Sequence, residues 1–349
     1  ETGDRGSVLA IALAPNNTVC VGGDLEAANS PHQSPYVACL AASNGEDIWI
    51  RKFPASGRAA IRNLAVSESG RVFAHGVVLP SSSLSVAGQQ ISTEVGTTAV
   101  FVAALAPGGG QLGATIIPAT TRSAIAEGIL SIEGDGGFVT SSTVDLGGVL
   151  SQFDENGAEV SSVALPAAGA IAWTENDKLI MAGTHTGELS WGDEEELVLS
   201  APTAANSSPK SNVYVVKLSL DGEAQWAESY GGTASELAAQ VAVSSHGDIY
   251  VVGVADNSGS INLGGDVLPS FGQFSMDVFV ASYSPQGEHR WSRTVGGESQ
   301  DFTIGLHLAD NGTASLLAIG TDPFTTELGT AQPPLNSLNQ PPYQVVFRQ

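Results

Sequence analysis

Two oxygen-rich segments and one tryptophan are the residues of this sequence with the chemistry to bind a ligand. Trp191, whose ring is of a kind that stacks on sugars, precedes the acidic run Asp193-Glu194-Glu195-Glu196, and Asp256 opens the segment Asp256-Asn257-Ser258-Gly259-Ser260. Carboxylates are calcium ligands, yet the acidic run lacks the alternating spacing and turn glycine of an EF-hand loop. We predict ligand-binding roles for Trp191, Asp193, Glu194 and Asp256. The favoured alternatives are a partly covered loop anchor for the tryptophan and solvated loops for the acids.

Metal-dependent and nucleophilic catalysis have no motif in the sequence. The six histidines show no paired ligand spacing, and there is no Gly-x-Ser-x-Gly nucleophile elbow. Glycine-rich segments 108–110 and 134–137 lie between predicted strands and not before helices, where phosphate would bind. We therefore predict no catalytic residue, no metal and no cofactor. A carboxylate pair for polysaccharide cleavage stays open, because separate strands can bring two acids together without a spacing rule.

The amino-acid composition argues against two classes of binding partner, nucleic acids and membranes. The chain has 349 residues, with 36 acidic and 13 basic side chains and a net charge of −23. This charge repels phosphate backbones and anionic lipid headgroups, so we predict neither nucleic-acid binding nor membrane insertion. The 41 glycines and 17 prolines indicate a chain with many turns and few helices.

An internal repeat must hold these residues in place. Its clearest copies are Asn212–Trp226 and Asp277–Trp291, which are 65 residues apart and each run on to a Gly-Gly pair. A turn glycine marks the frame, and apolar residues stand eight and four positions before it, the period-2 pattern of a strand entering a tight turn. The turn glycines are Gly45, Gly109, Gly157, Gly222 and Gly287.

A second hairpin precedes each of these units, so one repeat contains four antiparallel strands. Six such repeats follow one another, and this predicts an all-β fold, a six-bladed β-propeller. The last blade is incomplete, because the strand Tyr343–Phe347 is followed by too few residues for a fourth strand. We expect a ring closed by apolar packing between blades one and six, and an exposed third-strand edge open to another chain. The predicted blades are approximately 8–54, 60–118, 124–165, 168–232, 238–297 and 303–349, in one domain over residues 8–349.

The repeat resembles the bacterial SBBP-type β-propeller repeats of exported proteins in myxobacteria and their relatives. The resemblance rests on segments such as Asp277-Val-Phe-Val-Ala281, Trp291-Ser-Arg-Thr-Val-Gly-Gly297 and Gly247-Asp-Ile-Tyr-Val-Val-Gly253. It is strongest over residues 212–320 and weaker over 8–200. It implies a propeller and an exported protein, and it implies no activity.

The two cysteines and the N-terminal residues indicate the cellular compartment of the protein. Cys20 and Cys39 lie in neighbouring predicted strands, the second and third of blade one, so a disulfide is predicted, with two buried free thiols as the alternative. Residues 1–7 are interpreted as an expression remnant and leader remainder, so we expect a secreted or cell-surface protein.

Three functions follow from this reading of the sequence. The first is a non-catalytic binding or adhesion platform, monomeric, which binds a protein or glycan at the cell surface through face loops or the channel mouth. The second is a polysaccharide hydrolase or lyase with carboxylates at the channel, and the third is a structural spacer. Trp49, Trp226 and Trp291 recur at one position, so we expect them to be buried between adjacent blades.

Overall fold

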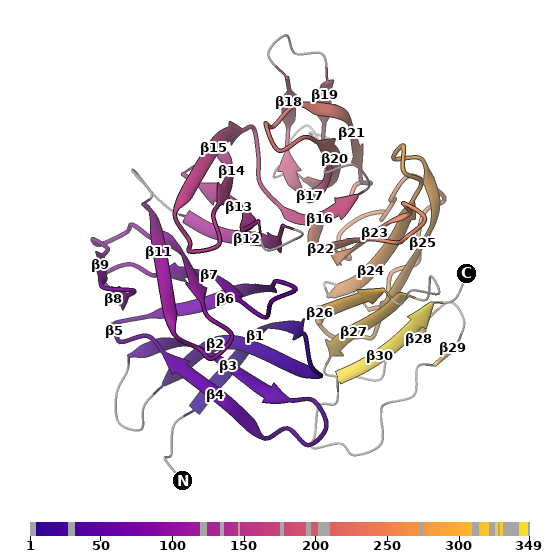
Figure 1. Ribbon diagram of the computed structural model, residues 1–349. Coiled ribbons are helices and arrows are strands. Elements are labelled where there is room, and N and C mark those ends of the chain that lie inside the picture. The colour runs from indigo at the N-terminus through magenta and orange to yellow at the C-terminus, as the bar shows by residue number, and fades with distance from the viewer. Residues whose placement is uncertain are drawn as a thin grey trace. The chain divides into compact units, whose positions relative to one another are not determined.

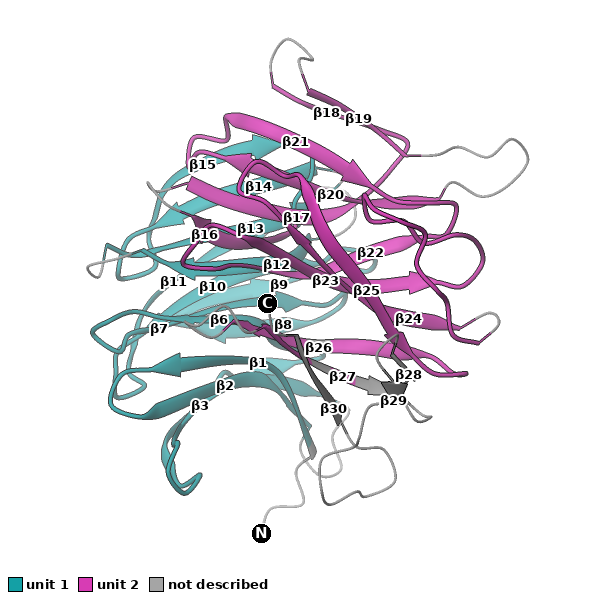
Figure 2. Cartoon of the chain, turned by 90° about the vertical axis from the view of Figure 1, so that its right-hand side faces the viewer, with its two compact units in different colours: residues 1–168 teal, residues 169–349 magenta. Residues whose placement is uncertain are grey.

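A computed structural model shows the chain as two compact units, residues 1–168 and 169–349, which Figure 2 colours separately. The sequence pattern predicts one domain, and that stays a prediction. Repeats that contact mainly their sequence neighbours explain a division between the third and fourth copies. The structure describes residues 5–26, 32–118, 124–132, 136–145, 147–174, 178–192, 197–201, 210–272, 275–308, 314–320, 325–326, 329–330 and 342–347.

Unit 1 contains three antiparallel sheets of four strands each, labelled in Figure 1. They are β1 (Arg5–Ala14), β2 (Thr18–Glu26), β3 (Gln33–Ala41) and β4 (Asp47–Lys52); β6 (Ala59–Val66), β7 (Val72–Val78), β10 (Ala99–Leu105) and β11 (Gln111–Pro118); and β12 (Ala124–Ser131), β13 (Phe138–Val144), β14 (Gly147–Phe153) and β15 (Glu159–Leu165). A small sheet of β5 (Ala55–Ser56), β8 (Ser83–Val86) and β9 (Gln89–Ser92) extends the second copy.

Unit 2 repeats the plan with more insertions. Its first sheet is β16 (Ala170–Thr174), β17 (Lys178–Thr186), β20 (Ser211–Leu218) and β21 (Ala224–Tyr230), and β18 (Glu188–Trp191) pairs with β19 (Leu197–Ser200). The second is β22 (Glu236–Val243), β23 (Ile249–Asp256), β24 (Met276–Tyr283) and β25 (His289–Gly296), extended by β28 (Thr325–Thr326) and β29 (Gly329–Thr330). The third is β26 (Asp301–Leu308), β27 (Ala314–Gly320) and β30 (Pro342–Phe347).

That third sheet has three strands among the described residues, with β30 at its end. The open edge expected there stays a prediction, because residues 331–341 and 348–349, which flank β30, lie outside the described part of the chain.

The turn glycines of the repeat explain where the strands end. All five have a positive φ, between 72° and 87°, in the left-handed region that side chains disfavour. Each follows the third strand of its sheet, so the chain reverses there into the fourth strand. The five are Gly45, Gly109, Gly157, Gly222 and Gly287.

Apolar packing joins neighbouring sheets within each unit. In unit 1 all seven residues of β10 are buried, because both faces of this strand are covered. Phe73, Phe138 and Phe153 stack between the second and third sheets, with ring centroids 4.4 and 4.8 Å apart. In unit 2 the corresponding contact of the first two sheets includes Val215 and Phe279.

The recurring tryptophans lie on outer strands and are half-buried, not fully buried as the sequence suggested. A Cβ on Gly109 would lie 2.6 Å from Trp49, and one on Gly287 would lie 2.9 Å from Trp226. The rings of Trp49 and Trp226 therefore pack over the turn glycine of the next sheet. Trp49 also donates a hydrogen bond from Nε1 to the carbonyl of Pro107, at 2.8 Å.

The predicted disulfide is confirmed. Cys20 of β2 and Cys39 of β3 face each other directly in the antiparallel register, with Cα atoms 4.1 Å apart, and their sulfur atoms are bonded. The bridge is buried among the apolar residues that join the first two sheets of unit 1.

Candidate functional site

A Gly-Gly turn followed by an acid occurs twice in unit 2, each time before the first strand of a sheet. The Gly232 N–H donates to Glu236 Oε1 at 3.1 Å, and the Gly297 N–H donates to Asp301 Oδ2 at 2.7 Å. Both acids are fully buried. The sequence comparison ended at the glycine pairs and missed these acids, although an acid follows the second glycine by four residues in both copies.

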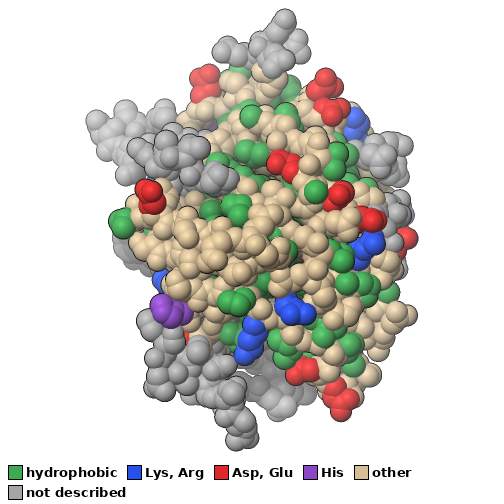
Figure 3. Space-filling model, turned by 60° about the vertical axis from the view of Figure 1, so that its left-hand side comes forward, with side chains coloured by type: hydrophobic (Ala, Val, Ile, Leu, Met, Phe, Trp, Pro, Cys, Tyr) green, Lys and Arg blue, Asp and Glu red, His purple; other side chains and the backbone are tan. Residues whose placement is uncertain are grey.

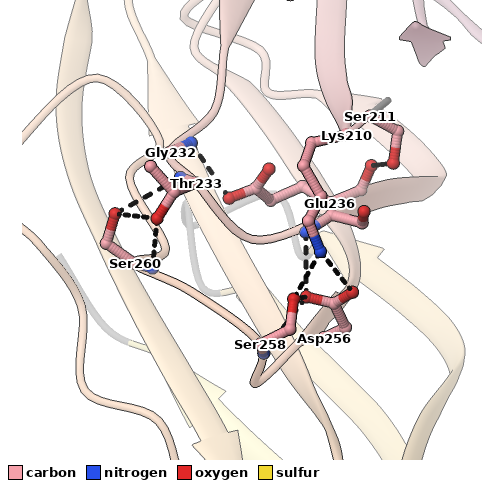
Figure 4. A network of polar contacts seen from close by, with 9 residues as sticks. Lys210, Ser211, Gly232, Thr233, Glu236, Asp256, Ser258 and Ser260 are labelled. Atoms are coloured by element: carbon pink, nitrogen blue, oxygen red, sulfur yellow. Dashed lines mark hydrogen bonds and ion pairs between the residues drawn. The ribbon is translucent and has the colours of Figure 1, made fainter. Parts of the chain in front are cut away.

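Glu236 is the centre of the polar network in Figure 4. Its Oε2 atom is buried and has no hydrogen-bond partner. Burial raises the pKa of Glu236 to about 7, and the negative charge of nearby Asp256 raises it further. The hydrogen bond from the Gly232 N–H favours the charged form and so lowers the pKa. This carboxyl therefore titrates near neutral pH.

Asp256 has the opposite environment, at the end of β23 (Figure 4). Burial disfavours its charge, but hydrogen bonds from Ser258 and the Ser235 N–H, with Lys210, outweigh burial and lower its pKa. The Ser258 hydroxyl donates at 2.6 Å and the Ser235 N–H at 3.0 Å, while Lys210 Nζ lies 3.4 Å from the other oxygen. These hydrogen bonds and the ion pair connect two loops of the chain, so the Asp256 carboxylate contacts other residues of the same chain.

The loop after Asp256 is also fixed to the Gly-Gly turn. Thr233 N–H donates to the Ser260 carbonyl at 2.9 Å, and Ser260 N–H donates to the Thr233 hydroxyl at 2.9 Å (Figure 4). A Cβ on Gly232 would overlap the Ser260 carbonyl, which explains the need for glycine there.

The next copy of this junction holds two acids in place of one. Asp277 of β24 is fully buried, and its Oδ2 accepts a hydrogen bond from the Phe271 N–H at 2.6 Å. Burial raises the pKa of Asp277 to about 6, although the Phe271 amide and the neighbouring Asn257 side chain favour the charged form. The structure thus brings Asp277 and Asp301 to one junction from separate strands.

Exposed apolar side chains recur on first strands of the sheets. A β-bulge interrupts the pairing of β12, β22 and β26 at the same place, and the residue two positions before each bulge is large, apolar and exposed. These residues are Ile125 (48% exposed), Leu237 (42%) and Phe302 (43%). β22 and β26 are neighbours in unit 2, where the Leu306 N–H donates to Gln240 Oε1 at 2.7 Å.

On the face that Figure 3 shows, hydrophobic side chains are dispersed among polar groups and backbone. Exposed apolar side chains that occur singly are normal on soluble proteins and need no functional explanation. Their recurrence at one register position is what distinguishes Ile125, Leu237 and Phe302.

Trp191, the predicted sugar-stacking residue, is 1% exposed. Its ring packs against Tyr214, with centroids 5.7 Å apart, so the face needed for stacking is covered in this structure. Asp193 and Glu194, the other two predicted residues beside it, lie outside the described part of the chain. The structure therefore does not bring the four predicted residues into one described site.

Unit 1 holds a polar group inside its packed sheets. His75 of β7 is fully buried, with Nδ1 3.1 Å from the Gly128 carbonyl and Nε2 3.1 Å from the Ser142 hydroxyl. Glu127, at the bulge of β12, accepts a hydrogen bond from Thr143 at 2.8 Å, and burial raises its pKa. Sequence alone gave no signal for either environment.

The described residues contain neither a metal-binding group nor a membrane-spanning helix. Within those ranges, no three His, Cys, Asp or Glu side chains are grouped as a metal site would require. In the same part of the chain, no helix has the length and apolar character needed to cross a bilayer.

The chain matches no family model and no curated protein sequence. Among solved structures it is similar to an ulvan lyase of polysaccharide lyase family PL25 (TM-score 0.51, 10% identity, 92% of this chain and 84% of the other). It is also similar to the Dos1 propeller, with a TM-score of 0.45 and 8% identity over 99% of this chain and 93% of the other. The β-propeller domain of the Trilobed protease from Pyrococcus furiosus matches with a TM-score of 0.40 and 10% identity over 90% of each chain. At these identities the likeness concerns the fold alone: the chain is all-β, and its structural neighbours include β-propellers.

Proposed function

We propose that this chain is an exported six-bladed β-propeller, related to the SBBP-type repeats, that acts as a non-catalytic binding or adhesion platform for a protein or glycan. Each unit would supply three blades. The disulfide between Cys20 and Cys39 supports export, because such bonds persist in oxidising compartments.

The recurrence of Ile125, Leu237 and Phe302 carries the proposal. These side chains occupy one register position on three of the first strands, β12, β22 and β26, and stay 42–48% exposed. Large apolar groups held at an exposed place on rigid strands are typical of ligand contacts. In a propeller blade the first strand is the innermost one, so Leu237 and Phe302, on the neighbouring strands β22 and β26 of unit 2, would form an apolar surface beside the channel.

The acids beside this surface support binding over catalysis. Glu236 and Asp301 directly precede Leu237 and Phe302, but both are fully buried and each accepts a backbone N–H of its own Gly-Gly turn. A general acid must reach its substrate within hydrogen-bond distance, and these carboxyl groups have no exposed surface.

The binding proposal is tested with the intact chain on a glycan array and against a library of cell-surface proteins. Once a ligand is found, Leu237→Ser and Phe302→Ser are each expected to weaken binding at least tenfold. Val198→Ser is the matched control, because Val198 is 46% exposed in the same unit but lies on the β18–β19 hairpin. The proposed binding surface would be contradicted if Val198→Ser weakened ligand binding as much as the other two variants do. It would also be contradicted if neither Leu237→Ser nor Phe302→Ser weakened binding.

One observation favours a polysaccharide-acting enzyme as the second candidate. Glu127 is only half-buried, has a raised pKa and lies at a bulge of a first strand, and bulges are frequent beside active sites. Release of new chain ends from anionic and neutral polysaccharides, abolished in Glu127→Gln, would establish this function in place of the first. A spacer would show neither binding nor turnover.

A further inference from the structure

Strand β4, labelled in Figure 1, is the outer strand of the first sheet of unit 1, and one of its edges is open. It pairs with β3, and no other strand of the described residues pairs with it. The Phe53 N–H donates to the Pro35 carbonyl at 2.9 Å, and Trp49–Lys52 continue this pairing in the same register. Because hydrogen-bonding groups alternate between the two sides of an antiparallel strand, the N–H and C=O of Ile50 point away from β3. Such an edge is a template for pairing with another chain.

The charged side chains of this segment are separated by sign. The acids Glu46 and Asp47 stand at its start, and residues 48–50 that follow are apolar. The bases Arg51 and Lys52 stand at its end. An antiparallel pairing aligns the start of one strand with the end of the other. Two copies of β4 paired in this way would therefore place the acids of each copy beside the bases of the other.

The other four outer strands lack this arrangement. β11 has no acidic or basic side chain apart from histidine, and neither strand β15 nor β21 has more than a single acid. β25 has two arginines and no acid, and its end is covered by β28. Like charges that meet across an edge oppose pairing, so two copies of these strands would not attract each other through charge. The separation of charge is thus a property of β4 and does not come from the repeat.

The size of Ile50 is a second departure of β4 from the repeat. The residue five positions after the turn glycine is small in the other four copies, where it is Ala114, Ser162, Ala227 or Ser292. In β4 it is isoleucine, 49% exposed, and the nearby Ile48 is 54% exposed. Large apolar side chains beside an open edge gain free energy when a second strand covers them. Both the apolar centre and the charged ends of the segment therefore suit a partner strand.

Contacts with the second sheet of unit 1 hold β4 in place. Trp49 Nε1 donates to the Pro107 carbonyl at 2.8 Å, and Arg51 Nε donates to the Gly109 carbonyl at 2.8 Å. The second contact uses one of the five N–H donors of the guanidinium, so Arg51 has the capacity to bind a carboxylate as well. The edge is therefore ordered before a partner arrives, which lowers the entropic cost of association.

We propose that the partner is a second copy of this chain, which pairs with β4 in antiparallel orientation about a two-fold axis near Ile50. The two four-stranded first sheets then form one continuous sheet, through the same surface on both copies. Residues 46–52 have two acids and two bases, so the segment is neutral in a chain of net charge −23. Repulsion between the remaining charges is screened beyond about 8 Å at physiological ionic strength. This homodimer replaces the monomer expected from the sequence.

The dimer is independent of the proposed ligand-binding surface. It uses the outer strand β4, whereas Leu237 and Phe302 lie on first strands. Loss of the dimer and loss of ligand binding are measured separately, so either proposal can fail without the other.

The test is sedimentation velocity of the intact chain from about 1 to about 200 µM, at about 0.15 M sodium chloride. We expect a species of twice the 35.6 kDa of one chain, with a dissociation constant on the order of 10 µM, because a single pair of strands buries less than a standard interface. Asp47→Lys and Lys52→Glu should each weaken the dimer at least about tenfold, because like charges then meet on both sides of the two-fold axis. An equimolar mixture of these two variants should recover the affinity of the unaltered chain to within about threefold, because the reversed charges then face each other.

Glu159→Lys is the matched control, because it makes the same change of charge on β15, another exposed outer strand of unit 1, and should leave the dimer unchanged. Thermal unfolding midpoints check that the variants are folded. Glu46→Lys with Arg51→Glu is a second complementary pair, so the test does not depend on one variant. A monomer at every concentration would overturn the proposal, and so would a dimer that Asp47→Lys does not weaken. Equal weakening by Glu159→Lys, or no recovery in either mixture, would also overturn it.

Discussion

Protonation of His75 should destabilise the protein in mild acid. The imidazole is fully buried between the second and third sheets of unit 1. Because the Gly128 carbonyl only accepts, Nδ1 carries the proton and Nε2 accepts from the Ser142 hydroxyl, so the neutral ring is satisfied. Burial lowers the pKa of His75 to about 3, although the bond to Gly128 favours the charged form.

The direction of the pH dependence follows from the pKa of His75 in the folded and in the unfolded chain. In the unfolded chain the histidine pKa is 6.5, whereas in the folded chain it is about 3. Between these pH values the unfolded state therefore binds a proton that the folded state does not bind. Folding stability is therefore unaffected by His75 above pH 6.5 and falls as the pH drops through 6.5 toward 3. At pH 5, about 1.5 units below 6.5, the loss is roughly 2 kcal/mol.

The measurement is urea unfolding followed by circular dichroism at pH 8 and pH 5. His75→Gln keeps one donor and one acceptor without titrating, so its loss of unfolding free energy between the two pH values should be smaller than that of the unaltered chain by about 2 kcal/mol. His246→Gln, at an exposed turn, controls for removal of a histidine. Equal pH dependence in the unaltered chain and His75→Gln, within about 0.5 kcal/mol, would refute the reasoning.

Two further predictions concern the repeat frame and the bridge. Gly109→Ala should destabilise the chain by at least about 1 kcal/mol more than Gly45→Ala, because both residues have positive φ but only a Cβ at Gly109 would meet Trp49. Comparable losses in chemical unfolding would contradict the packing of that ring. Replacing Cys20 and Cys39 by serine should cost about 3 kcal/mol, and mass spectrometry of the unreduced chain should detect no free thiol.

The strand frame was predictable because it depends on local chemistry. A glycine that follows alternating apolar residues at a fixed distance indicates a turn between two strands, because glycine adopts the left-handed region at little cost. The positive φ of Gly222 and Gly287 and the facing of Cys20 and Cys39 both follow from that register.

The candidate site was much less predictable. The acidic run beside Trp191 suggested sugar stacking, with a partly covered loop anchor as the favoured alternative, and the hairpin of β18 and β19 places the ring against Tyr214. Asp256 looked like a free ligand because its partners, Lys210 and Ser235, lie 46 and 21 residues away. Sequence patterning reports which strand face is apolar, whereas a side chain's polar partners depend on the packing of neighbouring repeats.

The departures of one repeat from another carry information that a single-copy protein would not offer. At the Gly-Gly junctions the backbone, the turn and the N–H to carboxylate bond are the same, and the side chain facing the first glycine changes from Asn212 to Asp277. Both side chains fill the same volume, so packing cannot explain the difference. What changes is charge: burial favours the protonated form of Asp277, whereas the Phe271 N–H and the Asn257 side chain favour its charged form. The fold itself therefore supplies the reference, an amide in the same surroundings, against which the role of the extra carboxylate is measured.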